Sequence, residues 1–173
     1  MIKIITTALL ILLALTKVQA QDISAWQGHY SGELKSENLQ GKTYFYPMEL
    51  KIEAVDDDTY KWIIIYGKEG DSARSERNYL LKRTSKKNNF IIDEQNTILL
   101  DINLINNSFY SVFEVQDNLM LVEYRLSENQ IDFNLTSSQG KTETGNSTHE
   151  GEEIPLVYSY KTTTRQHAVL KKR

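Results

Sequence analysis

The chain has 173 residues, 40% of them hydrophobic, which is enough for one domain with a substantial core. Its formal net charge of −3 gives it no general attraction to nucleic acid, so we expect no nucleic-acid partner. It contains no cysteine, which excludes disulfides, thiolate metal sites and a cysteine nucleophile.

Residues 1–20 have the pattern of a signal peptide. Lys3 supplies a positive charge, residues 4–15 are apolar, and Val18-Gln19-Ala20 has the form of a cleavage site. The apolar run is shorter than the roughly 20 residues that span a bilayer, although an uncleaved anchor is the alternative. We expect cleavage after Ala20, no later transmembrane segment, and a secreted or periplasmic protein. Cleavage removes Lys3 and Lys17 and no acidic residue, so the net charge moves from −3 to −5.

Strand patterns fill most of the remaining chain. Residues 26–34 alternate strictly, with Trp26, Gly28, Tyr30, Gly32 and Leu34 on one face. The run at 60–66 is rich in β-branched and aromatic residues, which favours a strand over a buried helix. Further strands are expected at residues 46–54, 77–83, 90–92, 98–104, 109–115, 119–126, 131–135 and from about 154.

Short polar turns separate these strands, roughly every 8–12 residues, which is typical of an all-β barrel or sandwich. Links that look like hairpins favour an up-and-down order, and a meander of this size closes to remove its exposed edges. We therefore predict a single antiparallel up-and-down barrel of about 8–10 strands over residues 21–173. Residues 137–153 are polar and are expected to form a flexible loop, and the basic tail at 165–173 is expected to fray.

The segment Trp26-x-Gly28-x-Tyr30 resembles the first-strand signature of the calycin superfamily, which includes lipocalins, fatty-acid-binding proteins and avidins. The mature chain is also similar to small exported bacterial lipocalin-like proteins. The resemblance implies a lipocalin-like barrel whose closed end is plugged by Trp26, with Lys161 or Arg165 covering the plug. The order Trp-x-Gly differs from the usual Gly-x-Trp of lipocalins, and residues 36–42 are too short for the helical lid of fatty-acid-binding proteins.

Aromatic residues at inward strand positions are the best candidates for a binding site. Aromatic rings with a polar tip suit amphipathic ligands, which need an apolar wall and a few hydrogen bonds. A small barrel can equally be filled by its own side chains, so an open and a solid lumen are both compatible with the pattern. The candidate ligand-binding residues are Trp62, Tyr79, Phe113, Tyr124 and Tyr158.

No pattern in the chain indicates catalysis or metal binding. His29, His149 and His167 are too far apart to share a ligand spacing, and Asp56-Asp57-Asp58 lacks the pattern of a calcium loop. There is no Gly-x-Ser-x-Gly motif. We therefore predict a protein that is not an enzyme and has no cofactor, no metal and no catalytic residue.

Basic residues cluster between positions 74 and 87. Such a cluster either attracts an anionic head group at the barrel mouth or keeps an edge strand soluble. We predict an exported lipocalin-like binding protein for a small apolar or amphipathic molecule. The alternative is an envelope or extracellular protein-interaction module with a solid core and an envelope protein as its partner. The cluster comprises Arg74, Arg77, Lys82, Arg83, Lys86 and Lys87.

Overall fold

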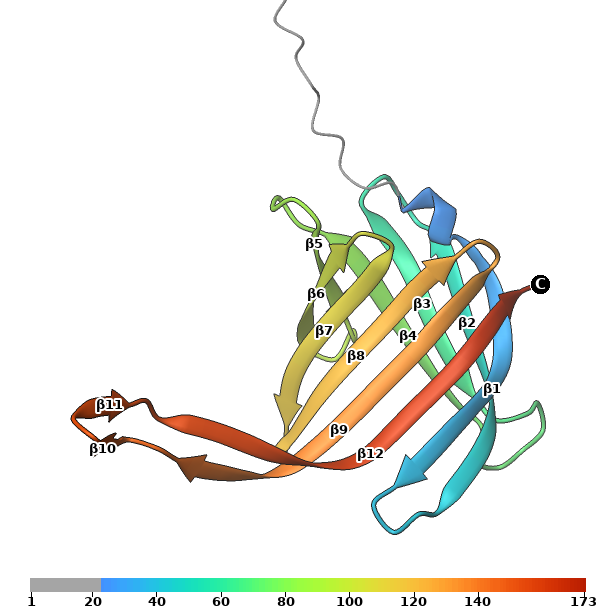
Figure 1. Ribbon diagram of the computed structural model, residues 1–173. Helices are drawn as coiled ribbons and strands as arrows, with labels where there is room; N and C mark the ends of the chain where they lie inside the picture. The colour runs from blue at the N-terminus through green and yellow to red at the C-terminus, as the bar shows by residue number, and fades with distance from the viewer. Residues whose placement is uncertain (1–22) are drawn as a thin grey trace, which may run out of the picture.

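The computed structural model describes residues 23–173 (Figure 1). The predicted signal peptide and its cleavage site at Ala20 lie outside the described residues. Within residues 23–173, no helix is both long and apolar enough to cross a membrane.

Ten strands form one closed antiparallel barrel, which confirms the predicted fold class. Going round the barrel, the strands follow chain order from β2 to β9, and β12 then closes the sheet between β9 and β1. Strands β10 and β11 pair only with each other, outside the barrel. The elements are the 3₁₀ helix η1 (Ser24–Trp26) and strands β1 (Gly28–Asn38), β2 (Thr43–Ala54), β3 (Thr59–Tyr66), β4 (Ser75–Arg83), β5 (Asn89–Asp93), β6 (Leu99–Ile105), β7 (Ser108–Val115), β8 (Asn118–Ser127), β9 (Gln130–Thr144), β10 (Ser147–His149), β11 (Glu152–Ile154) and β12 (Val157–Lys172).

Alternation along each strand sorts its side chains between lumen and solvent. On β3, Tyr60, Trp62 and Ile64 are buried, whereas Lys61 between them is exposed. The same alternation buries Ala168 and Leu170 near the end of β12, where we expected a frayed tail. The tail is ordered into the sheet because these two apolar side chains enter the core, and Lys171 pairs opposite Ser31 of β1.

Trp26 closes one end of the barrel from a short helix, not from a strand. Helix η1 ends at Trp26, and the chain turns at Gly28, where φ is +149°, to begin β1. The indole of Trp26 is only 2% exposed, and the hydroxyl of Tyr30 donates a hydrogen bond of 3.0 Å to the Trp26 carbonyl oxygen. The plug implied by the calycin resemblance is therefore present.

The basic residue beside the plug is Lys172, which corrects the expectation for Lys161 and Arg165. The Nζ of Lys172 lies 5.7 Å from the centroid of the Tyr30 ring. Arg165 instead pairs opposite Glu37, near the other end of the barrel, and Lys161 lies opposite Gln139 of β9. Strand β12 is 16 residues long, and only its last residues reach the plugged end of the barrel. Lys161 and Arg165 lie too early on this strand to cover Trp26.

The seam between β1 and β12 is tight at Gly32. A Cβ atom on Gly32 would overlap the carbonyl oxygen of Val169, so only glycine fits at this point of the seam.

An arm projects from the open end of the barrel where we expected a flexible loop. Strands β9 and β12 continue beyond the barrel wall as a two-stranded ribbon, with Thr142 opposite Ser159 and Thr144 opposite Val157, and β10 and β11 extend it (Figure 1). This corrects the predicted loop at residues 137–153. Threonine recurs along the segment and favours extended strand, and the turns fall at residues with positive φ, including Gly145 and Gly151. The flexibility of the segment stays a prediction.

Candidate functional site

The lumen is filled at the plugged end and hollow at the other. Buried side chains occupy the plugged half, among them Trp26, Tyr30, Phe90 and Phe109. Beyond them lies a cavity of about 910 Å³. The sequence allowed a solid or an open lumen, and the structure has both, one in each half.

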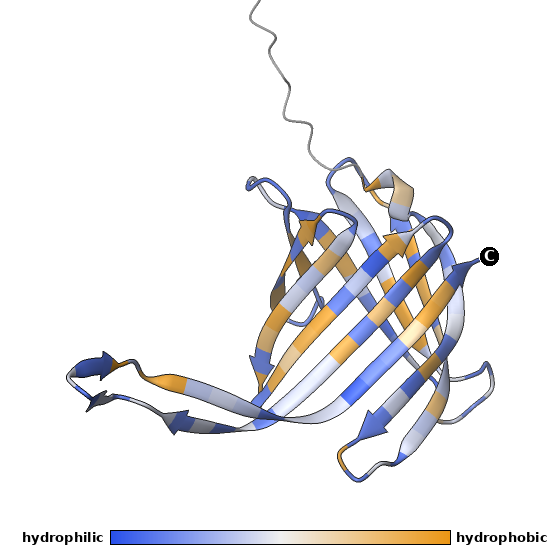
Figure 2. Cartoon of the chain, in the orientation of Figure 1, coloured by the Kyte–Doolittle hydropathy of each residue, from blue (hydrophilic) through white to orange (hydrophobic). Residues whose placement is uncertain are grey.

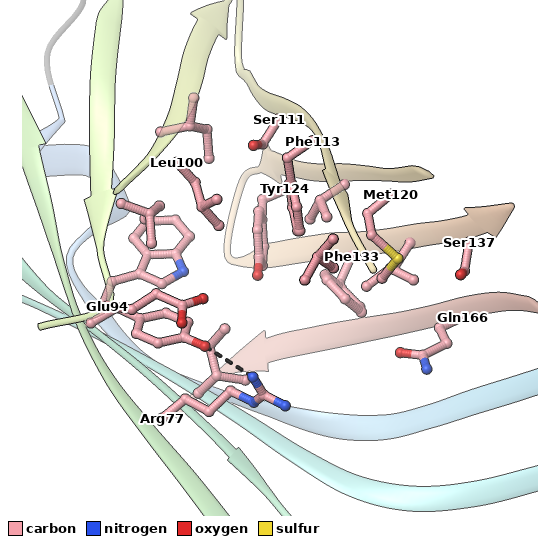
Figure 3. A pocket seen from close by; sticks show the side chains of 18 of the residues that line it. Arg77, Glu94, Leu100, Ser111, Phe113, Met120, Tyr124, Phe133, Ser137 and Gln166 are labelled. Atoms are coloured by element: carbon pink, nitrogen blue, oxygen red, sulfur yellow. Dashed lines mark hydrogen bonds between the residues drawn. The ribbon is translucent and has the colours of Figure 1, made fainter. Parts of the chain in front are cut away.

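The cavity opens at the end of the barrel opposite the plug. Its lining includes Tyr46 near the start of β2, Glu94 just after β5 and Val115 at the end of β7, which all lie at this end in an antiparallel barrel. Its apolar wall contains Trp62, Ile64, Ile92, Leu100, Phe113, Met120, Val122, Phe133 and Leu135 (Figure 3).

Packed aromatic rings form the floor of the cavity. The ring of Trp62 meets that of Tyr124 edge-on, with centroids 5.1 Å apart, and Tyr124 lies 5.1 Å from Phe133. On its other side Trp62 contacts Trp26 and Phe109, at centroid distances of 6.3 and 5.7 Å. Trp62 therefore joins the solid core of the plugged half to the floor of the cavity, and such edge-on pairs hold their rings in defined positions.

A polar trio lies on one wall of the cavity. Arg77 and Tyr79 both point inward from β4 because they are two residues apart, and Glu94 follows β5, the neighbouring strand. The Nη1 of Arg77 donates a hydrogen bond of 3.0 Å to the Tyr79 hydroxyl (Figure 3). This bond is the largest cause of the raised pKa of Arg77, to which the negative charge of Glu94 also contributes. The trio therefore presents a fixed cation, a hydroxyl and a carboxylate to the same space.

The tyrosines of the cavity stay protonated at neutral pH. Burial raises the pKa of Tyr124, and this outweighs a hydrogen bond from Trp62 that acts in the opposite direction. Burial likewise raises the pKa of Tyr66 and of Tyr79, with the charge of Arg77 lowering both in part. Their hydroxyls consequently serve as neutral donors and acceptors, and the fixed charge of the wall comes from Arg77 and the carboxylates.

The opposite wall carries neutral polar groups. Ser137 on β9 and Gln166 on β12 face the cavity from strands half-way round the barrel from β4 (Figure 3). Ser111 also lines the cavity, but its hydroxyl already donates a 2.7 Å hydrogen bond to the carbonyl oxygen of Asp101. Of the three charged side chains that line the cavity, Arg77 and Glu94 share one wall, and Glu114 lies apart from them on β7.

Four of the five predicted site residues meet in this cavity. Trp62, Tyr79, Phe113 and Tyr124 all line it. Tyr158 does not, because it lies on the arm, where its side chain is 45% exposed and the Nζ of Lys141 sits 3.8 Å from its ring centroid. Tyr158 does lie on a strand, as its alternating pattern predicts, but this part of β12 belongs to the arm and not to the barrel wall. Ligand binding by the other four stays a prediction.

Arg77 and Glu94 line the cavity, although neither is among the residues predicted for the binding site. Arg77 belongs to the basic cluster of residues 74–87, in which two other members form ion pairs at the surface: Arg74 with Glu76 at 3.2 Å, and Lys82 with Asp93 at 2.7 Å. One signal in the sequence could have identified Arg77. It is two residues from Tyr79, and residues two apart on a strand point to the same face of the sheet.

Within residues 23–173, no group of three or more His, Cys, Asp or Glu side chains is arranged to hold a metal ion.

Comparisons with known proteins define the fold but not a family. No protein-family model matches the chain, and no curated protein matches it. Among solved structures, a protein of unknown function from the DUF3598 family of Nostoc punctiforme matches with a TM-score of 0.60 and 11% identity, over 89% of this chain and 50% of that one. An S-type phycobiliprotein lyase from Guillardia theta matches with a TM-score of 0.57 and 7% identity, over 85% and 88% of the two chains.

The chain thus spans half the length of the Nostoc protein and nearly the whole of the lyase. At these identities the likeness shows the fold alone, a lipocalin-like barrel.

Proposed function

We propose that this protein binds a small amphipathic molecule in the hollow half of its barrel. The observation that carries the proposal is the cavity itself: about 910 Å³, with an aromatic floor and one charged wall. Binding sites for small molecules are typically about 300–1,000 Å³, mostly apolar, with a few polar groups that fix orientation. The cavity combines these three properties.

The ligand we propose has a flat or branched apolar body and one polar end. The body would contact Trp62, Phe113 and Phe133, whose rings offer broad apolar surfaces. The polar end would lie against Arg77 and Glu94, so it would carry both an acceptor and a donor group. A purely hydrocarbon ligand is disfavoured, since it would displace water from the charged groups of Arg77 and Glu94 without offering them a polar partner in return.

The likeness to the phycobiliprotein lyase supports the proposal only at the level of scaffold. Fold does not determine function, so the cavity and not the comparison carries the proposal. We propose binding without turnover, because the polar trio lacks the paired nucleophile and base that covalent catalysis requires. We extend the proposal to an exported protein, on the expectation that residues 1–20 are a signal peptide.

A pair of neighbouring substitutions on β8 tests whether the lumen is the binding site. Met120 lines the cavity, whereas Leu121 points outward from the same strand. Met120→Trp would fill part of the cavity, and Leu121→Trp adds the same side chain to the outer surface. The probe is N-phenyl-1-naphthylamine, an uncharged aromatic dye whose fluorescence rises in apolar sites, titrated into each purified protein.

We expect saturable binding by the native protein and by Leu121→Trp, and a loss of at least about tenfold in affinity for Met120→Trp. Circular dichroism verifies that both variants are folded. Equal affinity in the two variants would place the probe outside the lumen and refute the proposal.

The anionic dye 1-anilinonaphthalene-8-sulfonate tests the charged wall. Arg77→Gln keeps a polar, though shorter, side chain and removes the cation beside Tyr79. We expect this change to weaken binding of the anionic dye several-fold and to leave the uncharged dye unaffected. If both dyes respond alike, the wall of Arg77 does not orient the ligand.

A further inference from the structure

The hairpin between β1 and β2 reaches beyond the barrel wall at the open end (Figure 1). It lies next to the cavity mouth, since Leu34 and Tyr46 on its two strands line the cavity. We call residues 38–46 the hairpin tip. Four large side chains of the tip are each between 44% and 57% exposed: Leu39, Tyr44, Phe45 and Tyr46. Soluble proteins seldom leave such a concentration of apolar surface uncovered at one place unless it contacts something.

The tip is apolar on both faces. Tyr44 and Tyr46 lie on one face with their rings stacked at 6.4 Å, while Phe45 points to the other. Tyr46 pairs opposite Leu34, and both side chains line the cavity, so the tyrosine face leads directly into the mouth. Leu39 adds an apolar side chain at the turn, where Figure 2 shows an orange segment. The tip would thus be fully covered only by a medium that surrounds it.

We propose that the hairpin tip inserts into the interface of a lipid bilayer. A flat protein surface covers one face of a hairpin, whereas a bilayer covers both faces and the turn. Tyrosines are favoured at the level of the head groups, and Phe45 and Leu39 are suited to the outer acyl region. Residues 38–46 contain no acidic residue, and Lys42 is exposed among them, so the tip also complements lipid phosphates.

Docking in this way places the cavity mouth against the membrane. Tyr46 belongs both to the tip and to the cavity lining, so an amphipathic molecule leaving the bilayer would meet the lumen without crossing water. This use of the docking rests on the proposed function, but the docking itself requires no ligand. The two are therefore separable by experiment.

The first experiment places a reporter in the tip. The native tryptophans Trp26 and Trp62 are 2% and 1% exposed, so a Phe45→Trp substitution adds a single accessible indole. The protein is mixed with vesicles of phosphatidylcholine, alone or with about one third phosphatidylglycerol. We expect a blue shift of the added emission and quenching by lipids brominated on their acyl chains. An unshifted, unquenched signal with both kinds of vesicle would overturn the proposal.

The second experiment compares two matched double substitutions by vesicle flotation. Leu39→Ser with Phe45→Ser removes the apolar side chains of the tip, and Val112→Ser with Leu121→Ser removes a cross-strand apolar pair of similar exposure from the barrel wall. We expect the tip variant to partition at least about tenfold more weakly than the native protein, and the wall variant to be unchanged. We further expect Lys42→Gln to abolish the gain, about fivefold, that phosphatidylglycerol brings.

Two other outcomes would overturn the docking. Equal losses in the tip and wall variants would mean that vesicles bind through general surface hydrophobicity. Self-association in sedimentation without lipid, abolished by the tip substitutions, would mean that the tip contacts a second copy of the chain. Binding of the naphthylamine dye in solution is expected to survive the tip substitutions, so failure of docking and failure of the proposed function give different results.

Discussion

Replacing Trp26 by alanine tests the structural division of the barrel into a plugged half and a hollow half. Trp26 lies in the plugged half, 2% exposed, with its ring 4.7 Å from that of Phe109 and 6.3 Å from that of Trp62. The substitution removes these contacts but leaves the backbone carbonyl that accepts the hydrogen bond from Tyr30. The expected effect is therefore mainly lost packing.

The magnitude follows from the burial. Truncation of a fully buried tryptophan to alanine typically costs about 3–5 kcal/mol, part of it from the void left behind. Domains of this size are stable by about 5–15 kcal/mol, so the variant should fold but lose a large share of its stability. We expect its melting temperature to fall by roughly 10 °C. Tyr30→Phe, which removes only the 3.0 Å hydrogen bond, should cost about 1 kcal/mol.

The assay is urea denaturation followed by far-ultraviolet circular dichroism, with Val112→Ala as control. Val112 is 60% exposed on the barrel wall, and its truncation should change the free energy of unfolding by less than about 0.5 kcal/mol. A loss below about 1 kcal/mol for Trp26→Ala would instead show that η1 does not close the barrel.

Three further predictions concern the seam and the titratable groups. Gly32→Ala should destabilise the barrel by more than about 1 kcal/mol, because the added methyl overlaps a carbonyl oxygen of β12, and urea denaturation measures the loss. Burial raises the pKa of Tyr124, so the stability that its neutral form supports is complete below about pH 10 and is lost as the pH rises towards the folded pKa. An absorbance titration should find one tyrosine that ionises only when the protein unfolds. Full ionisation of all tyrosines in the folded protein would contradict this. The pKa of Asp93 is lowered by a hydrogen bond from Lys82 and, to a smaller extent, by one from the backbone N–H of Gln95. The contribution of Asp93 to stability is therefore present above the ordinary carboxylate range and is lost as the pH falls through the folded pKa. Lys82→Met should flatten this acid dependence of the melting temperature.

The barrel was predictable from the sequence because its strands face two different media. Alternation such as that of the buried Met48, Leu50 and Ile52, with a charged residue after each, reports one buried and one exposed face, and turns between alternating runs report antiparallel order. Alternation also brought four of the five candidate residues to the lumen. It cannot report where a strand leaves the sheet, since a ribbon outside the barrel has the same period, and for that reason Tyr158 was misplaced.

The split of the lumen was not predictable, because it depends on packing between distant strands. Trp26 fills the axis only because η1 turns its ring toward Phe109 and Trp62, and nothing local to residues 24–28 specifies those neighbours. Arg77 was missed for a different reason. Charge density points to the whole segment 74–87, whereas the parity shared with Tyr79 separates Arg77 from Arg74 and Lys82, which form ion pairs at the surface.

The proposed function requires that the hollow half of the barrel holds a small amphipathic molecule. The most direct measurement is native mass spectrometry of the protein purified from its own host, with organic extraction of the same sample. We expect one added mass in the range of a small organic molecule, present at one per chain and recovered by extraction. A bare chain with nothing extractable, from a sample that also fails to bind the naphthylamine dye, would contradict it.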